Sequence, residues 1–396
     1  MEVLPMATGK QAIYLDYNAS APLLGEARAA MIGAFDIDAN PSSVHAAGRA
    51  ARALVQKSRR SVAALVNAKP DHVVFTSGAT EAAATLLTPN YSFGRSPLTF
   101  SRLYVCAADH PCMLAGGRFA KDALVTLPVQ ASGLLDLAAM ETALEGHDNT
   151  SGLPLVAVHW ANNETGVLQP IREVAALVKA KGGVLVVDAV QALGRIYIDI
   201  TDGCGDYLIL SSHKIGGPKG AGAFVAASDL MMPMPLITGG GQERGHRGGT
   251  EAVANIAGFG AAAEVAAETV ARFGDRAEIR DRLERTILDI APDAVIHGGD
   301  APRLANTLFF TIPGLKAETM QIAFDLAGLA VSAGSACSSG KVGRSHVLTA
   351  MGITSEEGAI RVSFGRETGE EAVAKFAEAF HKIVSRARPE NRLERA

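Results

Sequence analysis

The sequence predicts an α/β protein in which a large domain with a mostly parallel sheet is followed by a smaller α+β domain. Between about residues 40 and 230, short β-branched runs alternate with helical patterns, as they do where helices cover both faces of a parallel sheet. Near Glu251 this alternation gives way to a long Ala-rich helical stretch that runs to about Ile290. The length of 396 residues allows two or three domains, and no fixed repeat indicates a solenoid.

The large domain is expected to contain strands joined by amphipathic helices. We place the strands at residues 72–76, 102–107, 155–159, 184–188, 206–211 and 221–226. Residues 44–67 carry apolar side chains at 3.6-residue spacing, which predicts a helix with Ser42 or Ser43 as its N-cap. Residues 170–181 predict another helix, with Pro170 near its first turn and glycines 182 and 183 as its stop.

The smaller domain is expected to follow without a flexible linker. Its predicted elements are a strand at 306–312, a helix at 317–327, a Ser/Gly/Ala loop at 332–340, a strand at 359–364 and a closing helix at 370–387. Because no low-complexity segment separates the domains, we expect them to share one long helix and to pack firmly. The expected division is residues 16–258 for the large domain and 259–396, together with 1–15, for the small one.

Composition excludes several functional classes. The 37 Lys and Arg residues against 41 Asp and Glu residues give a net charge of -4, and the charges are interspersed, so nucleic acid is not an expected partner. No stretch free of these charges approaches the roughly 20 residues that span a bilayer. The first ten residues lack the pattern of a signal peptide. We therefore expect a cytoplasmic protein that does not bind a membrane.

The four cysteines provide neither a disulfide framework nor a CxxC metal pair, and no metal site is predicted. Cys106, Cys112 and Cys204 are interpreted as buried structural thiols. Cys337 differs, because it lies in a Ser/Gly/Ala segment that is too small-sided to pack into a core. We expect that segment to be a mobile loop that carries the thiol.

The first indication of a binding site is the run from Thr76 to Glu81, which follows a strand and opens a helix. Such a junction directs unpaired backbone N–H groups and the helix dipole at one point, and small residues let an anion approach. The run is therefore a candidate phosphate cradle. It is equally compatible with an ordinary capping box, in which Ser or Thr caps a helix and Glu follows.

Two further indications lie at later strand ends. Asp188 ends an apolar strand at the edge where open parallel sheets bind ligands, although a solvated loop Asp is the alternative. Lys214 follows another strand and precedes a Gly-Gly-Pro turn, where partial burial favours the neutral, nucleophilic amine. The alternative for Lys214 is an ordinary surface lysine.

Together the three indications match the requirements of pyridoxal 5'-phosphate. A cradle anchors the phosphate, a lysine bonds to the aldehyde, and a carboxylate keeps the pyridine nitrogen protonated so that the ring accepts electrons. The lysine follows the carboxylate by 26 residues. The combination predicts a pyridoxal-phosphate enzyme.

The sequence also resembles a known family over nearly its whole length, the cysteine desulfurases of the iron–sulfur-cluster and nitrogenase-associated type within the class V aminotransferases. The matching blocks are residues 14–20, 40–45, 76–81, 162–170, 188–191, 211–214, 239–250, 335–340 and 360–365. The resemblance implies fold type I, with a seven-stranded, mostly parallel sheet between helices. The block around Asp109, His110 and Pro111 departs from the usual family pattern, which bears on how the cofactor ring is oriented.

The resemblance also implies roles for individual residues. Lys214 matches the Schiff-base lysine, Asp188 the partner of the pyridinium, and His110 the imidazole that stacks on the ring and moves protons. Gln191 and Asn163 match contacts to the ring hydroxyl and the substrate. The phosphate side is matched by Ala79, Thr80, Ser211 and His213, with Thr250 reaching the phosphate of the partner subunit in a homodimer. Arg361 matches the guanidinium that pairs with the substrate carboxylate.

By the same resemblance, Cys337 is the thiol that takes sulfur from L-cysteine, which leaves as L-alanine. The persulfide would then pass its sulfur to an acceptor protein, such as a scaffold for iron–sulfur cluster assembly. Two alternatives keep the cofactor, a selenocysteine lyase and another class V aminotransferase. A third is an inactive member that serves as a docking protein in a sulfur-transfer complex.

Overall fold

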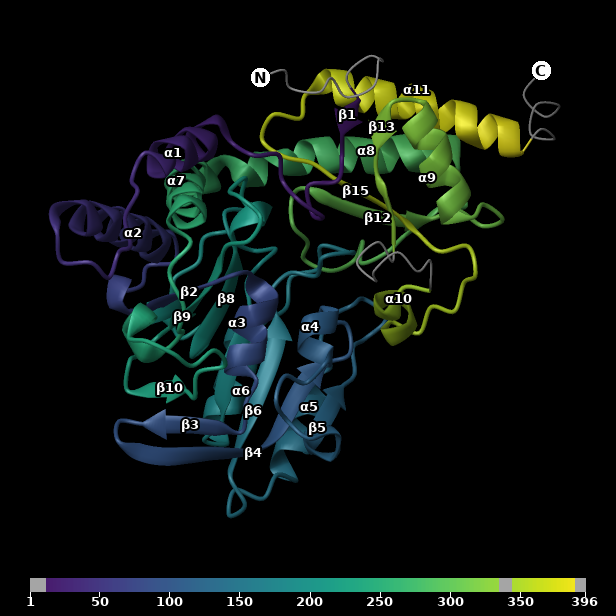
Figure 1. The fold of residues 1–396 in the computed structure, drawn as a ribbon. Helices are drawn as coiled ribbons and strands as arrows, with labels where there is room; N and C mark the ends of the chain where they lie inside the picture. Colours follow the sequence, from purple (N-terminus) through teal and green to yellow (C-terminus); the bar gives the residue numbers. More distant parts are fainter. Residues whose placement is uncertain (1–11, 335–343, 389–396) are drawn as a thin grey trace.

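A computed structural model describes residues 12–334 and 344–388 of the chain. Its central element is a nine-stranded sheet in the order β10-β3-β4-β6-β7-β8-β9-β2, with β5 also paired to β4 (Figure 1). Seven strands form the body of this sheet: β2 (Val73–Thr76), β4 (Ser96–Cys106), β5 (Leu124–Leu127), β6 (Leu153–His159), β7 (Val184–Asp188), β8 (Tyr207–Ser211) and β9 (Gly222–Ala226). Two short strands, β3 (Asn90–Phe93) and β10 (Met231–Pro233), extend one edge.

The pairings from β5 through β4, β6 and β7 to β8 are all parallel, whereas β9 pairs antiparallel with both β8 and β2. The predicted α/β class with a mostly parallel sheet of seven-stranded type is therefore confirmed. Sequence analysis missed β3, β5 and β10. Each is short, and the runs before and after them carry no strong period.

Side chains alternate between the two faces of the sheet, and each face has its own core. One core joins alternate strand residues to α2 (Ala46–Leu65), α5 (Leu137–Glu145), α6 (Ile171–Ala180) and α7 (Val253–Thr269). The other joins the intervening residues to α3 (Ala79–Leu86) and α4 (Pro111–Leu114). Because strand residues are buried on both faces, these strands read as continuous apolar runs. Helix α1 (Gly25–Phe35) packs on α7.

The predicted N-cap of α2 is wrong. The helix begins at Ala46, and the ring of His45 accepts a hydrogen bond from the backbone N–H of Gly48. Ser42 and Ser43 instead lie in a turn, in which their N–H groups donate to the side chain and the backbone carbonyl of Asn40. The Asx turn thus takes the two serines out of the capping position.

The later part of the chain forms a second sheet (Figure 1). Its order is β11-β12-β15-β14, formed by β11 (Val295–Ile296), β12 (Thr307–Thr311), β15 (Ile360–Ser363) and β14 (Ser332–Ala333). A two-stranded sheet pairs β1 (Ile13–Tyr14) with β13 (Leu329–Ala330). Helices α8 (Ala277–Ile290), α9 (Ala317–Leu326) and α11 (Glu370–Ala387) share a core with these strands, and the short α10 is His346–Ala350.

The long helix expected between residues 251 and 290 is not continuous. A 3-10 stretch, Val270–Arg276, separates α7 from α8, and it contains Gly274, which weakens a helix interior. The predicted division between residues 258 and 259 falls inside α7 and stays a prediction. Across the described ranges, no helix combines the length and apolar composition that a membrane crossing requires.

Candidate active site

The carboxyl ends of four strands bring side chains to one point on the face covered by α3 and α4. Alternation along each strand places Thr76, His159, Asp188 and Ser211 on that face. A cavity of about 450 Å³ opens there. It is lined by most of the predicted site residues, namely Ala79, Thr80, His110, Asn163, Asp188, Gln191, Ser211, His213 and Lys214.

The first turn of α3 forms the anion-binding end of this cavity. Gly78 is the N-cap, and no described side chain caps the helix there. The capping-box interpretation holds only in part, because the Glu81 carboxylate accepts a hydrogen bond from the Ser77 N–H (2.9 Å). A Cβ on Gly222 would lie 2.6 Å from the backbone of Gly78. Glycine there thus lets β9 pass directly beneath the turn.

Lys214 enters the cavity from the turn that follows β8. Its Nζ donates to the backbone carbonyls of Asn18 (2.5 Å) and Ala19 (3.0 Å). The next turn depends on glycine, since Gly216 has φ +85° and a Cβ on Gly217 would lie 2.1 Å from the Ser212 hydroxyl. Lys214 is therefore held at the cavity by the N-terminal segment rather than exposed as a surface lysine.

Asp188 is a buried carboxylate, not a solvated loop residue. Only 7% of it is exposed, and burial raises its pKa to about 6. A hydrogen bond from the Val190 N–H (3.0 Å) opposes that effect, whereas the Asp109 charge adds to it. A buried carboxylate beside a cavity binds a protonated ring nitrogen more strongly than a solvated one would.

Three imidazoles line the cavity, and two of them, His110 and His213, have a lowered pKa. His110 caps α4, and its Nδ1 accepts a hydrogen bond from the Cys112 N–H (3.2 Å). Burial, together with the Lys214 charge, lowers the pKa of His110 and of His213 to about 4. Both rings are therefore neutral at physiological pH, and the Nδ1 acceptor places the proton of His110 on Nε2.

These residues fit the cofactor that the sequence predicted. The helix N-terminus provides N–H donors for a phosphate, Asp188 provides a carboxylate, and Lys214 provides an amine inside one cavity. The Glu81 carboxylate nearby does not oppose an anion as a lone charge would, because it is paired with Arg247 (2.9 Å).

The sequence model of the Aminotransferase class-V family matches residues 13–376. The chain belongs to this family. It is 37% identical to a cysteine desulfurase of Sinorhizobium fredii, over 95% of this chain and 97% of the relative. It is 38% identical to a cysteine desulfurase of Frankia sp., over 95% and 92% of the two chains.

Solved structures agree with this class V assignment. A NifS-like protein from Rickettsia africae has a TM-score of 0.84 and 31% identity, and the match covers 94% of this chain and 99% of that one. A structure described as SspA in complex with cysteine has a TM-score of 0.71 and 28% identity, covering 89% and 98%. The resemblance to cysteine desulfurases and the fold-type-I expectation are thereby confirmed.

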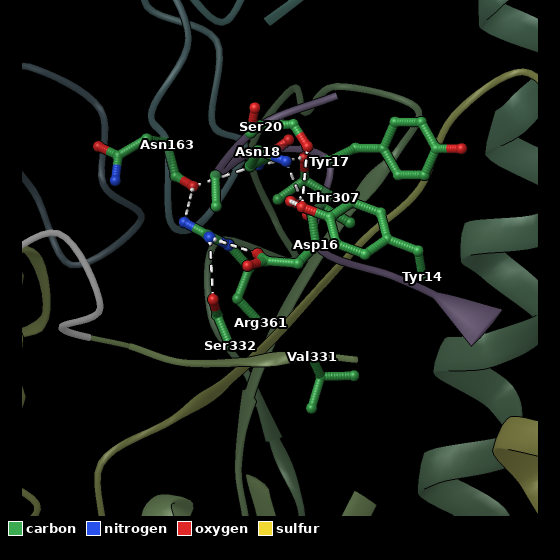
Figure 2. Close-up of polar contacts among 12 residues, drawn as sticks. Tyr14, Asp16, Tyr17, Asn18, Ser20, Asn163, Thr307, Val331, Ser332 and Arg361 are labelled. Carbon is green, nitrogen blue, oxygen red and sulfur yellow. Dashed lines mark hydrogen bonds and ion pairs between the residues drawn. The ribbon is translucent and has the colours of Figure 1, made fainter. Parts of the chain in front are cut away.

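Arg361, the candidate carboxylate-binding residue of this class V chain, does not line the cavity. Figure 2 shows its polar contacts, one of which is with Asn163, a residue of the cavity wall. Arg361 is almost fully buried, and its Nη2 pairs with the Asp16 carboxylate (2.7 Å) and the Ser332 hydroxyl (3.2 Å). Its Nη1 donates to the backbone carbonyl of Asn163 (3.0 Å). The buried Nε has no hydrogen-bond partner among the described residues.

Two predicted residues are not brought to the cavity. Thr250 is exposed and does not line it, and its predicted role toward a partner subunit stays a prediction. Cys337 lies outside the described residues, so its predicted role stays a prediction as well. The loop predicted at 332–340 is wrong at its start, because Ser332 and Ala333 form β14 and pair with β15.

The interpretation of Cys112 as a buried structural thiol is wrong. Cys112 is half-buried, lines the cavity and places its Sγ 3.0 Å from His110 Nδ1. Its position as the second residue of a helix that begins with Pro111, directly after the N-cap His110, could have indicated this contact. Cys106 and Cys204 are buried as expected. Sequence analysis also missed Asp16, which lies in a matched block but whose pairing with Arg361 spans 345 residues.

Proposed function

We propose that the chain is a pyridoxal-phosphate-dependent cysteine desulfurase. It would convert L-cysteine to L-alanine and pass the sulfur through Cys337 to an acceptor protein, such as a scaffold for iron–sulfur cluster assembly. The observation that carries this proposal is the single cavity in which Lys214, Asp188 and the first turn of α3 meet. It stands in a chain 37% identical to curated cysteine desulfurases along nearly its full length.

Cysteine desulfurases of the class V family are pyridoxal-phosphate enzymes. In this chain the phosphate would bind at Ala79 and Thr80, with Ser211 and His213 on the same side. When bound, the cofactor supplies an electron-accepting ring that stabilises the charge left on the α-carbon of the substrate.

Residues of the chain would carry out proton transfer and bind the substrate and the cofactor ring. Lys214 reaches the cavity as an amine and would take and return the α-carbon proton. His110, held neutral, would stack on the ring and present its Nε2–H to the cavity. Arg361 would bind the substrate carboxylate, and Asn163 would lie beside it, since its carbonyl already accepts from this guanidinium. Gln191 would contact the ring hydroxyl.

Sulfur transfer would balance without an outside oxidant. The Cys337 thiolate attacks the sulfur of the substrate, the C–S bond breaks, and its electron pair returns to the carbon that becomes the alanine methyl group. The two sulfur atoms end as a persulfide, while the carbon is reduced and takes up protons. A homodimer, with Thr250 reaching the phosphate of the partner subunit, is part of the same proposal.

The test is an assay of the purified, cofactor-loaded protein with L-cysteine, in which alanine and sulfide are measured with and without a thiol reductant. Equal amounts of alanine and sulfide are expected in the presence of reductant, and the Lys214→Ala variant should form neither. Amino-group transfer to a keto acid, retained in Cys337→Ala, would instead identify an aminotransferase. Turnover of selenocysteine with none of cysteine would identify a lyase, and no turnover of either would support a docking role.

A further inference from the structure

A buried chain of hydrogen bonds runs inward from His159, which lines the cavity, and has no part in the proposed function. Asp109 is fully buried, and its Oδ1 accepts from both the backbone N–H and the Nδ1 of His159 (2.8 and 2.6 Å). Its Oδ2 accepts from the Cys106 N–H (2.9 Å). Three donors thus satisfy this buried carboxylate.

The hydrogen bonds of Gln169 determine which nitrogen of the His159 imidazole carries a proton. The Oε1 of Gln169 accepts from the Leu135 N–H (2.8 Å), which fixes the orientation of the amide. Its Nε2 therefore faces the Gly133 carbonyl (2.9 Å) and the Nε2 of His159 (3.1 Å). Since an amide NH2 can only donate, the Nε2 of His159 has to accept. A second proton on His159 would set two donors against each other, so the ring is held neutral.

This arrangement leaves a negative charge close to Asp188. His159 and Asp188 are partners in the register of β6 and β7, so their side chains stand next to each other on the same face. The Asp109 charge raises the pKa of Asp188, whereas the Lys214 charge lowers it. Because the hydrogen bond from Gln169 opposes a cationic His159, that ring does not neutralise the Asp109 anion.

We propose that Asp109, His159 and Gln169 are positioning residues that place a second buried anion behind Asp188 and so strengthen its hold on a protonated ring nitrogen. The inference rests on the proposed function, because the ring nitrogen belongs to the cofactor. Asp109 carries the negative charge. His159 donates a hydrogen bond to Asp109 without neutralising it, and Gln169 donates to His159 and so disfavours a second proton on that ring.

The test measures cofactor affinity rather than activity. Apoprotein is titrated with pyridoxal 5'-phosphate and with the 1-deaza analogue, in which carbon replaces the ring nitrogen and carries no ionisable proton. The Asp109→Asn variant should bind pyridoxal 5'-phosphate about tenfold more weakly. Removing one nearby negative charge makes protonation of the ring nitrogen about tenfold less favourable. The affinity of the variant for the analogue should stay within about twofold of wild type. Equal losses for both ligands would show a merely structural role and overturn the proposal.

A second variant tests whether His159 is neutral or cationic, and a third serves as a control. His159→Gln keeps a neutral donor toward Asp109 and should change neither affinity by more than about twofold. If the variant bound pyridoxal 5'-phosphate about tenfold more tightly, His159 would be a cation in the wild type and the proposal would be wrong.

The matched control is Asp206→Asn. Asp206 is also largely buried and also accepts a backbone N–H, that of Leu185 (2.8 Å), but it lies at the opposite end of the strands. Neither affinity should change. Wild-type apoprotein that bound neither ligand would contradict the proposed function itself, which is a different outcome from equal losses in Asp109→Asn.

Discussion

Replacing Glu164 by Gln is expected to stabilise the protein at alkaline pH but not at acidic pH. Glu164 follows Asn163 and is only 3% exposed. Its carboxylate accepts a hydrogen bond from the Ser345 hydroxyl (2.5 Å), and Ser345 in turn caps α10 by accepting from the Leu348 N–H (3.1 Å). Burial raises the pKa of Glu164 to about 7, although the hydrogen bond from Ser345 and the Arg361 charge both lower it.

The raised pKa of Glu164 determines how its contribution to stability depends on pH. The unfolded chain releases the Glu164 proton near the ordinary value of 4.5, whereas the folded chain keeps it until about 7. Between these values the folded state binds more protons, so the contribution of Glu164 to stability falls as pH rises. The full loss, reached above pH 7, is about 3 kcal/mol. Gln does not titrate and resembles the protonated carboxyl group.

The measurement is urea unfolding of the apoprotein between pH 4 and 8. The free energy of unfolding of Glu164→Gln minus that of wild type should rise by about 3 kcal/mol across this range. A change in stability caused by the amide itself would be the same at every pH, so it does not affect the expected rise. Glu357→Gln is the matched control, since Glu357 also accepts from a serine, Ser355, but this hydrogen bond lowers its pKa, so the difference for that variant should not rise with pH. A difference for Glu164→Gln that did not vary with pH would refute the reasoning.

Three further experiments test the active site. After borohydride reduction, mass spectrometry of wild type should find the phosphopyridoxyl adduct on the Lys214 peptide, and an adduct on Lys219, which also lines the cavity, would overturn that assignment. Asp188→Asn should keep the cofactor but slow proton removal by about tenfold to a few hundredfold, the value of one charge-assisted hydrogen bond; an unchanged rate of turnover would contradict it. Cys337→Ser should bind cysteine yet form almost no alanine and no persulfide by alkylation mapping. Persulfide on Cys112 with alanine formed at the wild-type rate would reassign the thiol.

Local patterns predicted the elements more completely than the contacts between them. The strand expected at residues 184–188 and the helix expected at 370–387 coincide with β7 and α11, because an apolar run bounded by polar residues and a 3.6-residue period are both properties of adjacent residues. The 3-10 break before α8 escaped prediction. A single Gly274 in a helical pattern does not by itself specify where hydrogen bonds change from one type to the other.

Most of the cavity residues were predicted from motifs, but their electrostatic environment was not. Nothing in the local sequence around Asp109 indicates that its carboxylate meets His159, 50 residues later. That contact requires β4 and β6 to be neighbours in the sheet, with both residues at their carboxyl ends. Side-chain pairs of this kind depend on topology, which the alternation of strands and helices restricts but does not determine.

The hydrogen bonds of Arg361 have a consequence for how a substrate would bind. Its Nη2 already donates to Asp16 and to Ser332, and its Nη1 to the Asn163 carbonyl (Figure 2). Both N–H groups of Nη2 are therefore in use, so a substrate carboxylate that takes two parallel hydrogen bonds from this guanidinium has to displace either Asp16 or Ser332 from Nη2. Ser332 belongs to β14, and Cys337 follows it by five residues along the chain. The side chain proposed to hold the substrate thus contacts the strand that precedes the proposed sulfur acceptor.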